Sequence, residues 1–521
     1  MASNILWADD EIDLLKPHLL FLRNKGYNVL TANNGRDALD MLDSEHFDLI
    51  ILDENMPGLT GLETLQRIKE RQPHIPVIMI TKSEEENIMD QAVGNNIADY
   101  LIKPVNPNQI LIALKKHLHS DELVSEQAAT DYRREFPELS QLVNSAESIE
   151  DWYRVYSKLV YWEMKLAEAE TNMDQLLDMQ KLEANSEFNK FVRRNYENWV
   201  RGGDVPPEPD GETPVMSPRV LQKAVFPLLD KGESVFFVVI DNFRLDQWMA
   251  VKGLLADSFT FDEQLYTSIL PTATQYARNA IFSGLMPVTI AKMFPDLWVD
   301  EDAEEGKNIN ESPLLETQFQ RFRRQCRFSY NKVNDAQGVE RLMRDFNSLL
   351  RNDLNVVVFN FIDMLSHART ESKMIRELAS NNSAYRSLTR SWFQHSGALD
   401  FYRRVAEKGC RLVLTTDHGT IRVSNPIKVV GDKNTNTNLR YKVGKNLAYN
   451  PKQVYEIKRP ERFGLPSPNV SSTYIFASGR DFFAYPNNYN HYVQYYQDTF
   501  QHGGISMEEM LIPLITFTPK S

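Results

Sequence analysis

Polar residues that could carry out phosphoryl transfer follow several short apolar runs near the start of the chain. They are Asp9 and Asp10 in ILWADDE, Asp53 in DLIILDENMPG, Thr81 in PVIMIT and Lys103 in DYLIKP. Three carboxylates that meet stay ionised together only when a cation lies among them, and an all-oxygen site suits Mg²⁺. Asp53 would then attack a phosphoryl group, while Mg²⁺ and Lys103 neutralise its oxygens and Thr81 hydrogen-bonds the new phosphate.

A second set of chemically capable residues is spread over the C-terminal part of the chain. It comprises Asp241 in VFFVVID, Thr272 and Thr274 in LPTAT, Asp363 and His367 in FIDMLSH, Asp417 and His418 in TTDHG, and His502 in FQHGG. Three Asp, three His and a hydroxyl supply about the seven donors that two divalent ions need. A metal pair roughly 4 Å apart can bind both the attacking and the leaving oxygen of a phosphoryl displacement. His with carboxylate favours Zn²⁺, and Mn²⁺ is also compatible.

The elements that carry the first set alternate between strand and helix patterns. Strands are predicted over 5–8, 29–31, 49–52, 77–80 and 100–102, and helices over 14–22, 38–42, 62–68, 88–93 and 110–118. Strict alternation predicts a doubly wound, flavodoxin-like parallel sheet, in which the site lies beyond the carboxyl ends of the strands.

These N-terminal residues resemble the receiver domain of bacterial two-component response regulators over the first 118 positions. The resemblance implies that Asp53 is the phospho-acceptor. It also implies a magnesium site formed by Asp9, Asp10, Asp53 and the backbone carbonyl of Asn55. Thr81 and Tyr100 would be the switch pair, Lys103 would bind the phosphate, and the Lys103–Pro104 bond would be cis.

The middle of the chain has a helical pattern only. Apolar residues recur at spacings of three and four, at Trp152, Val155, Tyr156, Leu159, Trp162 and Leu166. They predict one face of a helix in a bundle, used either for core packing or for a dimer surface.

Glycine and proline in 201–213 predict a linker, and apolar strands over 235–240, 356–361 and 412–415 predict an α/β domain. We therefore expect an α/β multidomain chain with a receiver over 1–120, a helical connector over 121–204 and a large domain over 205–521.

The order of the C-terminal motifs resembles the alkaline phosphatase superfamily: Asp, then P-T-x-T, D-x-x-x-H, D-H-G and H-G. The ending HGGISMEEMLIPL is similar to its PglZ branch. The resemblance implies one zinc ion held by Asp363, His367 and His502, and another held by Asp241, Asp417, His418 and Thr274. It implies Thr274 as the nucleophile, because the second threonine of the motif has that role in the family. Ala277 replaces an Asn of the pyrophosphatase relatives, so Arg278 or Asn279 is expected to stabilise the transition state.

Composition limits the function classes. Lys plus Arg number 58 against 71 for Asp plus Glu, a net charge of −13, which disfavours non-specific binding to nucleic acid or to an anionic membrane. No apolar run approaches the roughly 18 residues of a membrane span, so a cytoplasmic protein without membrane insertion is expected. The two cysteines are too few for a Cys-ligated zinc site.

One segment departs from the acidic average. Residues 421–462 contain ten Lys or Arg and three acids, interleaved with Tyr441, Tyr449 and Tyr455. Such a segment could bind an oligonucleotide backbone and stack its bases. It could equally be a solvated basic insertion that balances acidic neighbours.

Taken together, the three parts resemble PorX-type response regulators of the type IX secretion system. The resemblance implies a cognate sensor histidine kinase, a phosphorylation-dependent homodimer, two zinc ions, and a phosphodiesterase that acts on cyclic or linear oligonucleotides. Two alternatives stay open. The C-terminal domain could bind metal yet serve mainly as a docking module for a sigma factor or a secretion-system component, or it could be a phosphomonoesterase that acts on a small metabolite.

Overall fold

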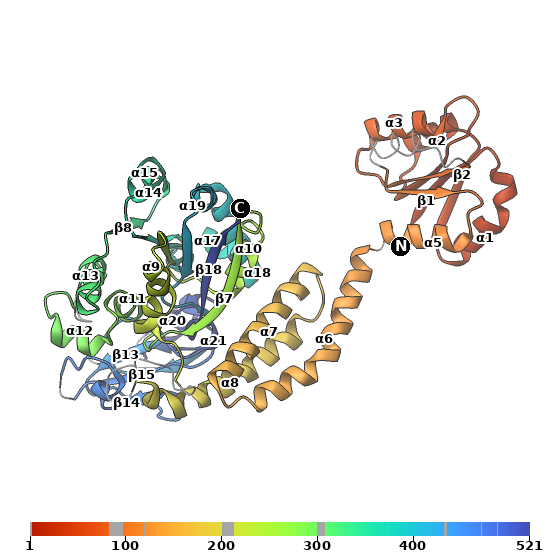
Figure 1. Ribbon diagram of the computed structural model, residues 1–521. Helices are drawn as coiled ribbons and strands as arrows, with labels where there is room; N and C mark the ends of the chain where they lie inside the picture. The colour runs from red at the N-terminus through yellow and green to blue at the C-terminus, as the bar shows by residue number, and fades with distance from the viewer. Residues whose placement is uncertain are drawn as a thin grey trace. The chain divides into compact units, whose positions relative to one another are not determined.

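The computed structural model describes residues 3–82, 97–118, 120–200, 213–299, 308–371, 373–431, 435–469, 471–486 and 488–520 (Figure 1). Contacts within the chain divide it into two units, which meet after Thr130. The domain boundaries at 120 and 204 stay predictions. Among the helices of these ranges, none has the length and apolar character that a membrane span requires.

The N-terminal unit contains a five-stranded parallel sheet of order β2-β1-β3-β4-β5. The strands are β1 (Asn4–Ala8), β2 (Asn28–Ala32), β3 (Leu49–Asp53), β4 (Val77–Thr81) and β5 (Asp99–Ile102). This order is that of flavodoxin-like doubly wound folds. The predicted fold class and the five strands are confirmed.

Helices cover this sheet because strand side chains alternate between its two faces. The helices are α1 (Lys16–Asn24), α2 (Gly35–Ser44), α3 (Gly61–Arg71) and α5 (Pro107–Leu118), and a short 3₁₀ helix, Ile12–Leu15, precedes α1. Leu6 and Ala8 belong to one buried cluster, and Ile5 and Trp7 belong to another. The helix predicted over 88–93 lies outside the described residues.

Three helices follow the N-terminal sheet and its helices: α6 (Ser120–Asn144), α7 (Ile149–Glu168) and α8 (Asp174–Trp199). Helix α7 begins with a capping box formed by Ser148 and Asp151. All six apolar residues of the predicted face are buried, which supports the interpretation as core packing rather than as a dimer surface. The predicted linker lies outside the described residues, apart from the buried Thr213.

The C-terminal domain is built on a six-stranded sheet of order β7-β18-β10-β6-β9-β8. Its strands are β6 (Val235–Ile240), β7 (Phe259–Thr267), β8 (Phe328–Val333), β9 (Leu354–Phe359), β10 (Arg411–Thr415) and β18 (Leu511–Pro519). Strands β10, β6, β9 and β8 are parallel, whereas β18 runs antiparallel to both β10 and β7. The strand predicted over 356–361 extends two residues too far, because Phe361 already begins α16 (Phe361–Glu371).

The remaining elements surround this sheet. The helices are α9 (Phe226–Asp230), α10 (Leu245–Lys252), α11 (Thr274–Ser283), α12 (Pro287–Met293), α13 (Glu311–Arg321), α14 (Ala336–Arg344), α15 (Phe346–Leu349), α17 (Lys373–Leu378), α18 (Asn382–His395), α19 (Ala398–Glu407), α20 (Tyr489–Tyr496) and α21 (Met507–Met510). Short strands pair as β11 (Ile421–Arg422) with β17 (Phe500–Gln501), and β12 (Asn425–Lys428) with β16 (Asp481–Ala484). A third small sheet has the order β13 (Tyr441–Gly444), β15 (Thr473–Phe476), β14 (Tyr455–Ile457).

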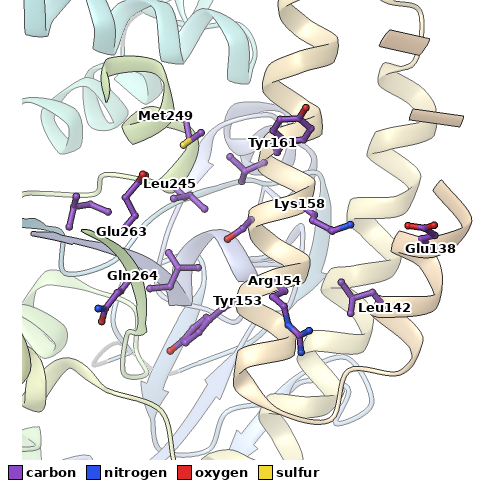
Figure 2. Close-up of a pocket in the computed structure, with 14 residues that line it drawn as sticks. Glu138, Leu142, Tyr153, Arg154, Lys158, Tyr161, Leu245, Met249, Glu263 and Gln264 are labelled. Carbon is purple, nitrogen blue, oxygen red and sulfur yellow. The ribbon is translucent and has the colours of Figure 1, made fainter. Parts of the chain in front are cut away.

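A groove of about 640 Å³ lies between helix α7 and the edge strand β7. Tyr153 and Lys158 line it from α7, and Leu245 and Met249 line it from α10 (Figure 2). None of the residues that line this groove is a predicted metal ligand, so the predicted metal sites lie elsewhere in the domain.

Candidate phospho-acceptor pocket and metal centre

The structure gathers the first set of residues at the carboxyl ends of the receiver strands. Asp9 follows β1 and Asp53 ends β3, and both are buried, whereas Asp10 is exposed. Candidate ligand atoms of these three carboxylates lie within 4.8 Å of one another. The Lys103 Nζ atom lies 2.9 Å from Asp9 Oδ2 and 2.9 Å from Asp53 Oδ1. Two of the three acids, Asp9 and Asp53, therefore share the Lys103 ammonium.

The electrostatics of this pocket favour a second cation. Burial raises the pKa of Asp53, and the neighbouring Asp9 raises it further, although Lys103 opposes both effects. Burial lowers the pKa of Lys103, but its bonds to Asp53 and Asp9 outweigh burial and leave that pKa raised. Lys103 therefore stays charged, and a divalent ion would relieve the remaining excess of negative charge.

The other predicted receiver residues occupy the same end of the sheet. Thr81 ends β4 and is buried, Tyr100 lies on β5 and is partly buried, and Asn55 is exposed in the loop after β3. The Lys103–Pro104 bond is cis, as predicted. Gly61, which no sequence motif singled out, also belongs to this pocket: a Cβ atom there would lie 2.5 Å from the carbonyl oxygen of Asp53. Only glycine allows α3 to begin this close to the pocket.

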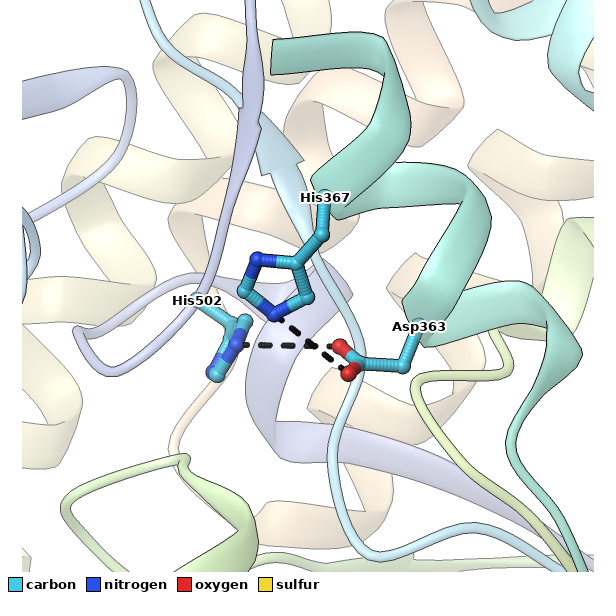
Figure 3. Close-up of side chains that lie close together, drawn as sticks. All are labelled: Asp363, His367 and His502. Carbon is cyan, nitrogen blue, oxygen red and sulfur yellow. Dashed lines mark ion pairs between the residues drawn. The ribbon is translucent and has the colours of Figure 1, made fainter. Parts of the chain in front are cut away.

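The first cluster of the C-terminal domain consists of Asp363, His367 and His502 (Figure 3). Asp363 and His367 are four residues apart on α16 and so share a face of that helix, and His502 directly follows β17. The His367 Nε2 atom lies 3.4 Å from Asp363 Oδ2, and the His502 Nε2 atom lies 4.0 Å from Asp363 Oδ1. The Asp363 carboxylate thus lies between two imidazoles.

The second cluster consists of Asp241, Asp417 and His418, all of them buried. Asp241 follows β6, and Asp417 and His418 follow β10; these strands are parallel neighbours, so their carboxyl ends meet. The His418 Nε2 atom lies 3.9 Å from Asp241 Oδ1 and 3.8 Å from Asp417 Oδ2. The rings of His418 and His502 stack at 4.2 Å, so the two clusters adjoin.

The two threonines of the LPTAT motif have different surroundings. Thr274 begins α11, and its Oγ1 atom lies 3.2 Å from His418 Nε2. The Thr272 hydroxyl is fully buried; it donates to the Gly504 carbonyl at 2.9 Å and accepts from the Gly503 amide at 3.0 Å. Thr272 therefore anchors the loop after His502, whereas Thr274 presents its hydroxyl to the second cluster.

Arg278 and Asn279 lie about one turn after Thr274 on α11, and both are buried. The Arg278 guanidinium contacts Asp241 Oδ2, and its Nε donates to Asp417 Oδ2 at 3.0 Å. Burial alone would lower the pKa of Arg278, but these acids raise it well above its usual value. A permanent cation thus lies against two of the predicted metal ligands.

The donor set is suited to divalent ions. Burial raises the pKa of Asp241 well above its usual value, and its Oδ1 atom accepts no hydrogen bond from the described residues. Burial, together with the nearby His418, lowers the pKa of His502 to about 3, which leaves its imidazole neutral. Neutral imidazoles and buried carboxylates are the ligands that zinc takes in proteins. Each cluster could therefore hold a metal.

Two further contributors lay outside the predicted set. Asn242 follows Asp241 with a φ of 64°, which is rare for a residue other than glycine, and donates from Nδ2 to Asp363 Oδ1 at 3.3 Å. A polar residue that directly follows a strand-ending acid was the available signal. Glu311 begins α13 and is 3.4 Å from Arg278 Nη1, but no motif in its neighbourhood indicated this contact.

Replacing Gly419 with alanine is expected to disturb the second cluster, because a Cβ atom there would overlap the carbonyl oxygen of Glu508. Overpacking of this kind lowers the free energy of unfolding by about 1–3 kcal/mol, and the displacement would include the adjacent His418. Urea unfolding and zinc titration measure the two effects. Gly253→Ala is the matched control, since Gly253 has a helical φ of −59° and no atom within 4 Å of the added Cβ. Equal behaviour of the two variants would contradict the expectation.

The basic insertion is less open than its composition suggested. Arg440, Tyr441 and Lys442 are buried, and Arg440 forms an ion pair with the buried Glu509. The interpretation of Tyr441 as a base-stacking surface is therefore wrong: this part of the insertion is a packed structural element. Lys428 and Lys452 are exposed and stay available to a phosphate backbone.

Comparisons with known proteins match three family models along the chain. Residues 5–115 match the response regulator receiver domain, residues 122–200 match the PorX response regulator linker domain, and residues 220–517 match the BREX system PglZ alkaline phosphatase-like domain. The alkaline phosphatase synthesis transcriptional regulatory protein PhoP of Bacillus subtilis is 28% identical over 160 residues, which make up 30% of this chain and 65% of PhoP. The transcriptional regulatory protein ZraR of Escherichia coli is 37% identical over 120 residues, which make up 22% of this chain and 27% of ZraR.

The chain thus spans less than two thirds of the length of either relative. Among solved structures, the chemotaxis protein CheY4 of Vibrio cholerae is similar, with 29% identity, 22% of this chain and 99% of that chain covered, and a TM-score of 0.22.

The acidic pocket, the Asp/His clusters and the three matches define a response regulator, in which a helical linker joins a receiver to an alkaline phosphatase-like effector. The chain belongs to the PglZ alkaline phosphatase-like family, and it has the architecture of a PorX-type response regulator. A receiver domain implies a cognate kinase, and the pocket of Asp9, Asp10 and Asp53 is typical of a receiver magnesium site.

Proposed function

We propose that this response regulator is phosphorylated on Asp53 and that its effector domain is a two-zinc phosphodiesterase with Thr274 as the nucleophile. The observation that carries the proposal is the meeting of two Asp/His clusters, joined by stacked imidazoles at 4.2 Å, with a threonine hydroxyl 3.2 Å from one of those rings. Such an arrangement suits in-line displacement at phosphorus.

The residues of each cluster have distinct tasks in this proposal. Asp363, His367 and His502 would hold one zinc ion, and Asp241, Asp417, His418 and Thr274 would hold the other. Bound zinc would neutralise the phosphoryl oxygens and lower the pKa of the threonine hydroxyl. The Thr272 carbonyl lies 3.0 Å from His502 Nδ1 and so directs Nε2 towards Asp363. Thr274 lies at the start of α11, where the helix dipole favours developing negative charge. Asn279 stays the proposed stabiliser of the transition state.

We place the substrate among cyclic or linear oligonucleotides and the biological role in control of type IX secretion. The PorX-type architecture supports both assignments, and the exposed Lys428 and Lys452 are compatible with a phosphodiester backbone. In the receiver, Asp9, Asp10, Asp53 and the Asn55 carbonyl would hold Mg²⁺. Phosphorylation of Asp53 would rearrange Thr81 and Tyr100, promote a homodimer and shape the effector site.

The test combines zinc content with a substrate panel. Elemental mass spectrometry measures the zinc content of the purified full-length protein. Hydrolysis of bis-p-nitrophenyl phosphate, p-nitrophenyl phosphate and a short cyclic oligonucleotide is then measured with and without acetyl phosphate. We expect about two zinc ions per chain and turnover of diesters. Two zinc ions without turnover would favour the docking module, and monoester turnover alone would favour a metabolite phosphatase.

Removal of zinc is expected to abolish diester hydrolysis reversibly. Dialysis against a chelator withdraws the charge that neutralises the phosphoryl oxygens, and the carboxylates left behind repel an anionic substrate. Activity should return on titration with zinc and reach its plateau near the second equivalent. Full activity in protein with no detectable metal would exclude the metal-based mechanism.

A further inference from the structure

Arg278 is the buried cation beside the second cluster, and each nitrogen of its guanidinium contacts a protein oxygen. Nη2 contacts Asp241, Nε contacts Asp417 at 3.0 Å, and Nη1 lies 3.4 Å from Glu311 Oε1 and 3.5 Å from Asn360 Oδ1. The side chain has no exposed surface. A group held in this way is poorly placed to approach a substrate.

Glu311 holds the side of Arg278 that faces away from the cluster. It is 1% exposed, accepts a hydrogen bond from the Tyr330 hydroxyl, and lies 3.3 Å from Lys332 Nζ. Tyr330 and Lys332 both belong to β8, which lies at the opposite edge of the six-stranded sheet from β7. A continuous series of contacts therefore runs from β8 through Glu311 and Arg278 to the two aspartates.

We infer that Arg278, held by Glu311, is a positioning residue that orients the carboxylates of Asp241 and Asp417 for metal binding. A guanidinium is a rigid planar fork, so fixing its far edge fixes the direction of its other donors. One oxygen of Asp241 is bound to Arg278, while the other accepts no hydrogen bond from the described residues and lies 3.9 Å from His418 Nε2. The second oxygen of Asp241 is therefore the one left to bind a metal beside His418.

This inference rests on the proposed two-zinc function and replaces the expectation that Arg278 stabilises the transition state. Three possible roles of Arg278 predict different zinc affinities for a variant that lacks it. If Arg278 positions the carboxylates, the variant binds zinc more weakly, because the carboxylates lose their orientation. If Arg278 only competes with zinc as a cation, the variant binds zinc more tightly, because the repulsion disappears. If Arg278 contacts only the transition state, the variant binds zinc as the wild type does and has a lower kcat.

The experiment measures zinc dissociation constants by competition with a chromophoric chelator, and the visible spectrum of the Co²⁺-substituted full-length chain. Arg278→Gln is expected to weaken one of the two zinc equivalents by about 10- to 100-fold and to change the cobalt spectrum. Glu311→Gln, which leaves every metal ligand and Arg278 in place, should act in the same direction with a smaller effect. Arg278→Lys should recover part of the affinity, since it restores the charge but not the fork.

Arg386→Lys is the matched control. Arg386 is a buried arginine that bridges two acids, Glu163 at 2.6 Å and Asp246 at 3.2 Å, and none of its ion pairs with described residues reaches a predicted metal ligand. This control should bind zinc as the wild type does. Unchanged or tighter zinc binding in Arg278→Gln, with an unchanged cobalt spectrum, overturns the inference.

If Arg278→Gln does not fold, the zinc affinity of Glu311→Gln becomes the deciding measurement. Wild-type zinc affinity in Glu311→Gln would also overturn the inference. Failure of the proposed function has a different signature, since the wild-type chain itself would then bind fewer than two zinc ions or would bind two without hydrolysing a diester.

Discussion

Replacing Thr274 with alanine is expected to lower phosphodiester hydrolysis by about three orders of magnitude or more, with close to two zinc ions still bound. The variant loses the only atom that we assign as the attacking group. The imidazole and carboxylate ligands of both clusters keep their positions, because they are carried by β6, β10, α16 and the segment after β17. Initial rates with bis-p-nitrophenyl phosphate and zinc content measure the two halves of this result.

Two hydroxyl-preserving variants separate the nucleophile from its neighbour. Thr274→Ser keeps an oxygen beside His418 and should retain a substantial fraction of the activity. Thr272→Ser keeps the hydrogen bonds to Gly503 and Gly504 and should behave as the wild type. Wild-type turnover in Thr274→Ala, with zinc intact, would show that water or another residue attacks the phosphorus.

The receiver was predictable because each of its constraints is local. Alternating strand and helix patterns fix a parallel sheet, and the carboxyl ends of parallel strands meet, so acids placed after β1 and β3 had to converge. Asp241 and Asp417 also follow neighbouring parallel strands, but that adjacency was not predicted, and their grouping at one metal came from the family resemblance. The pairing of His502 with Asp363 came only from the family resemblance.

What the sequence could not provide is the partner of a buried charge. Arg278 has a place on a helix, but its contact with Glu311, 33 residues away, depends on how α11 packs against α13. Arg440 was counted as part of a basic surface, whereas its partner Glu509 lies 69 residues further along the chain and buries it. Charge counts over a segment assume exposure, and long-range ion pairs remove that assumption.

Replacing Asp53 with asparagine is expected to reduce phosphoryl incorporation from acetyl phosphate to background. A carboxamide is not a nucleophile, so the variant lacks the group that would attack the phosphoryl donor. Misfolding would not explain the loss. Burial raises the pKa of Asp53, so its ionised form destabilises the fold above that pKa, and neutral asparagine removes this effect at neutral pH. Intact-mass spectrometry measures incorporation, and Asp43→Asn, an exposed acid paired with Arg71, is the control that should be phosphorylated normally.

The same variant tests whether the receiver controls the effector. If phosphorylation acts through Asp53 and the buried Thr81, any change that acetyl phosphate causes in the dimer fraction and diester turnover of the wild type must be absent in Asp53→Asn. Light scattering and initial rates before and after acetyl phosphate measure both quantities. A modification shifts an equilibrium between two conformations only when it stabilises one of them more than the other. A chain that cannot be phosphorylated gains no such stabilisation. Equal responses in the wild type and Asp53→Asn would therefore place the control of the effector outside the receiver pocket.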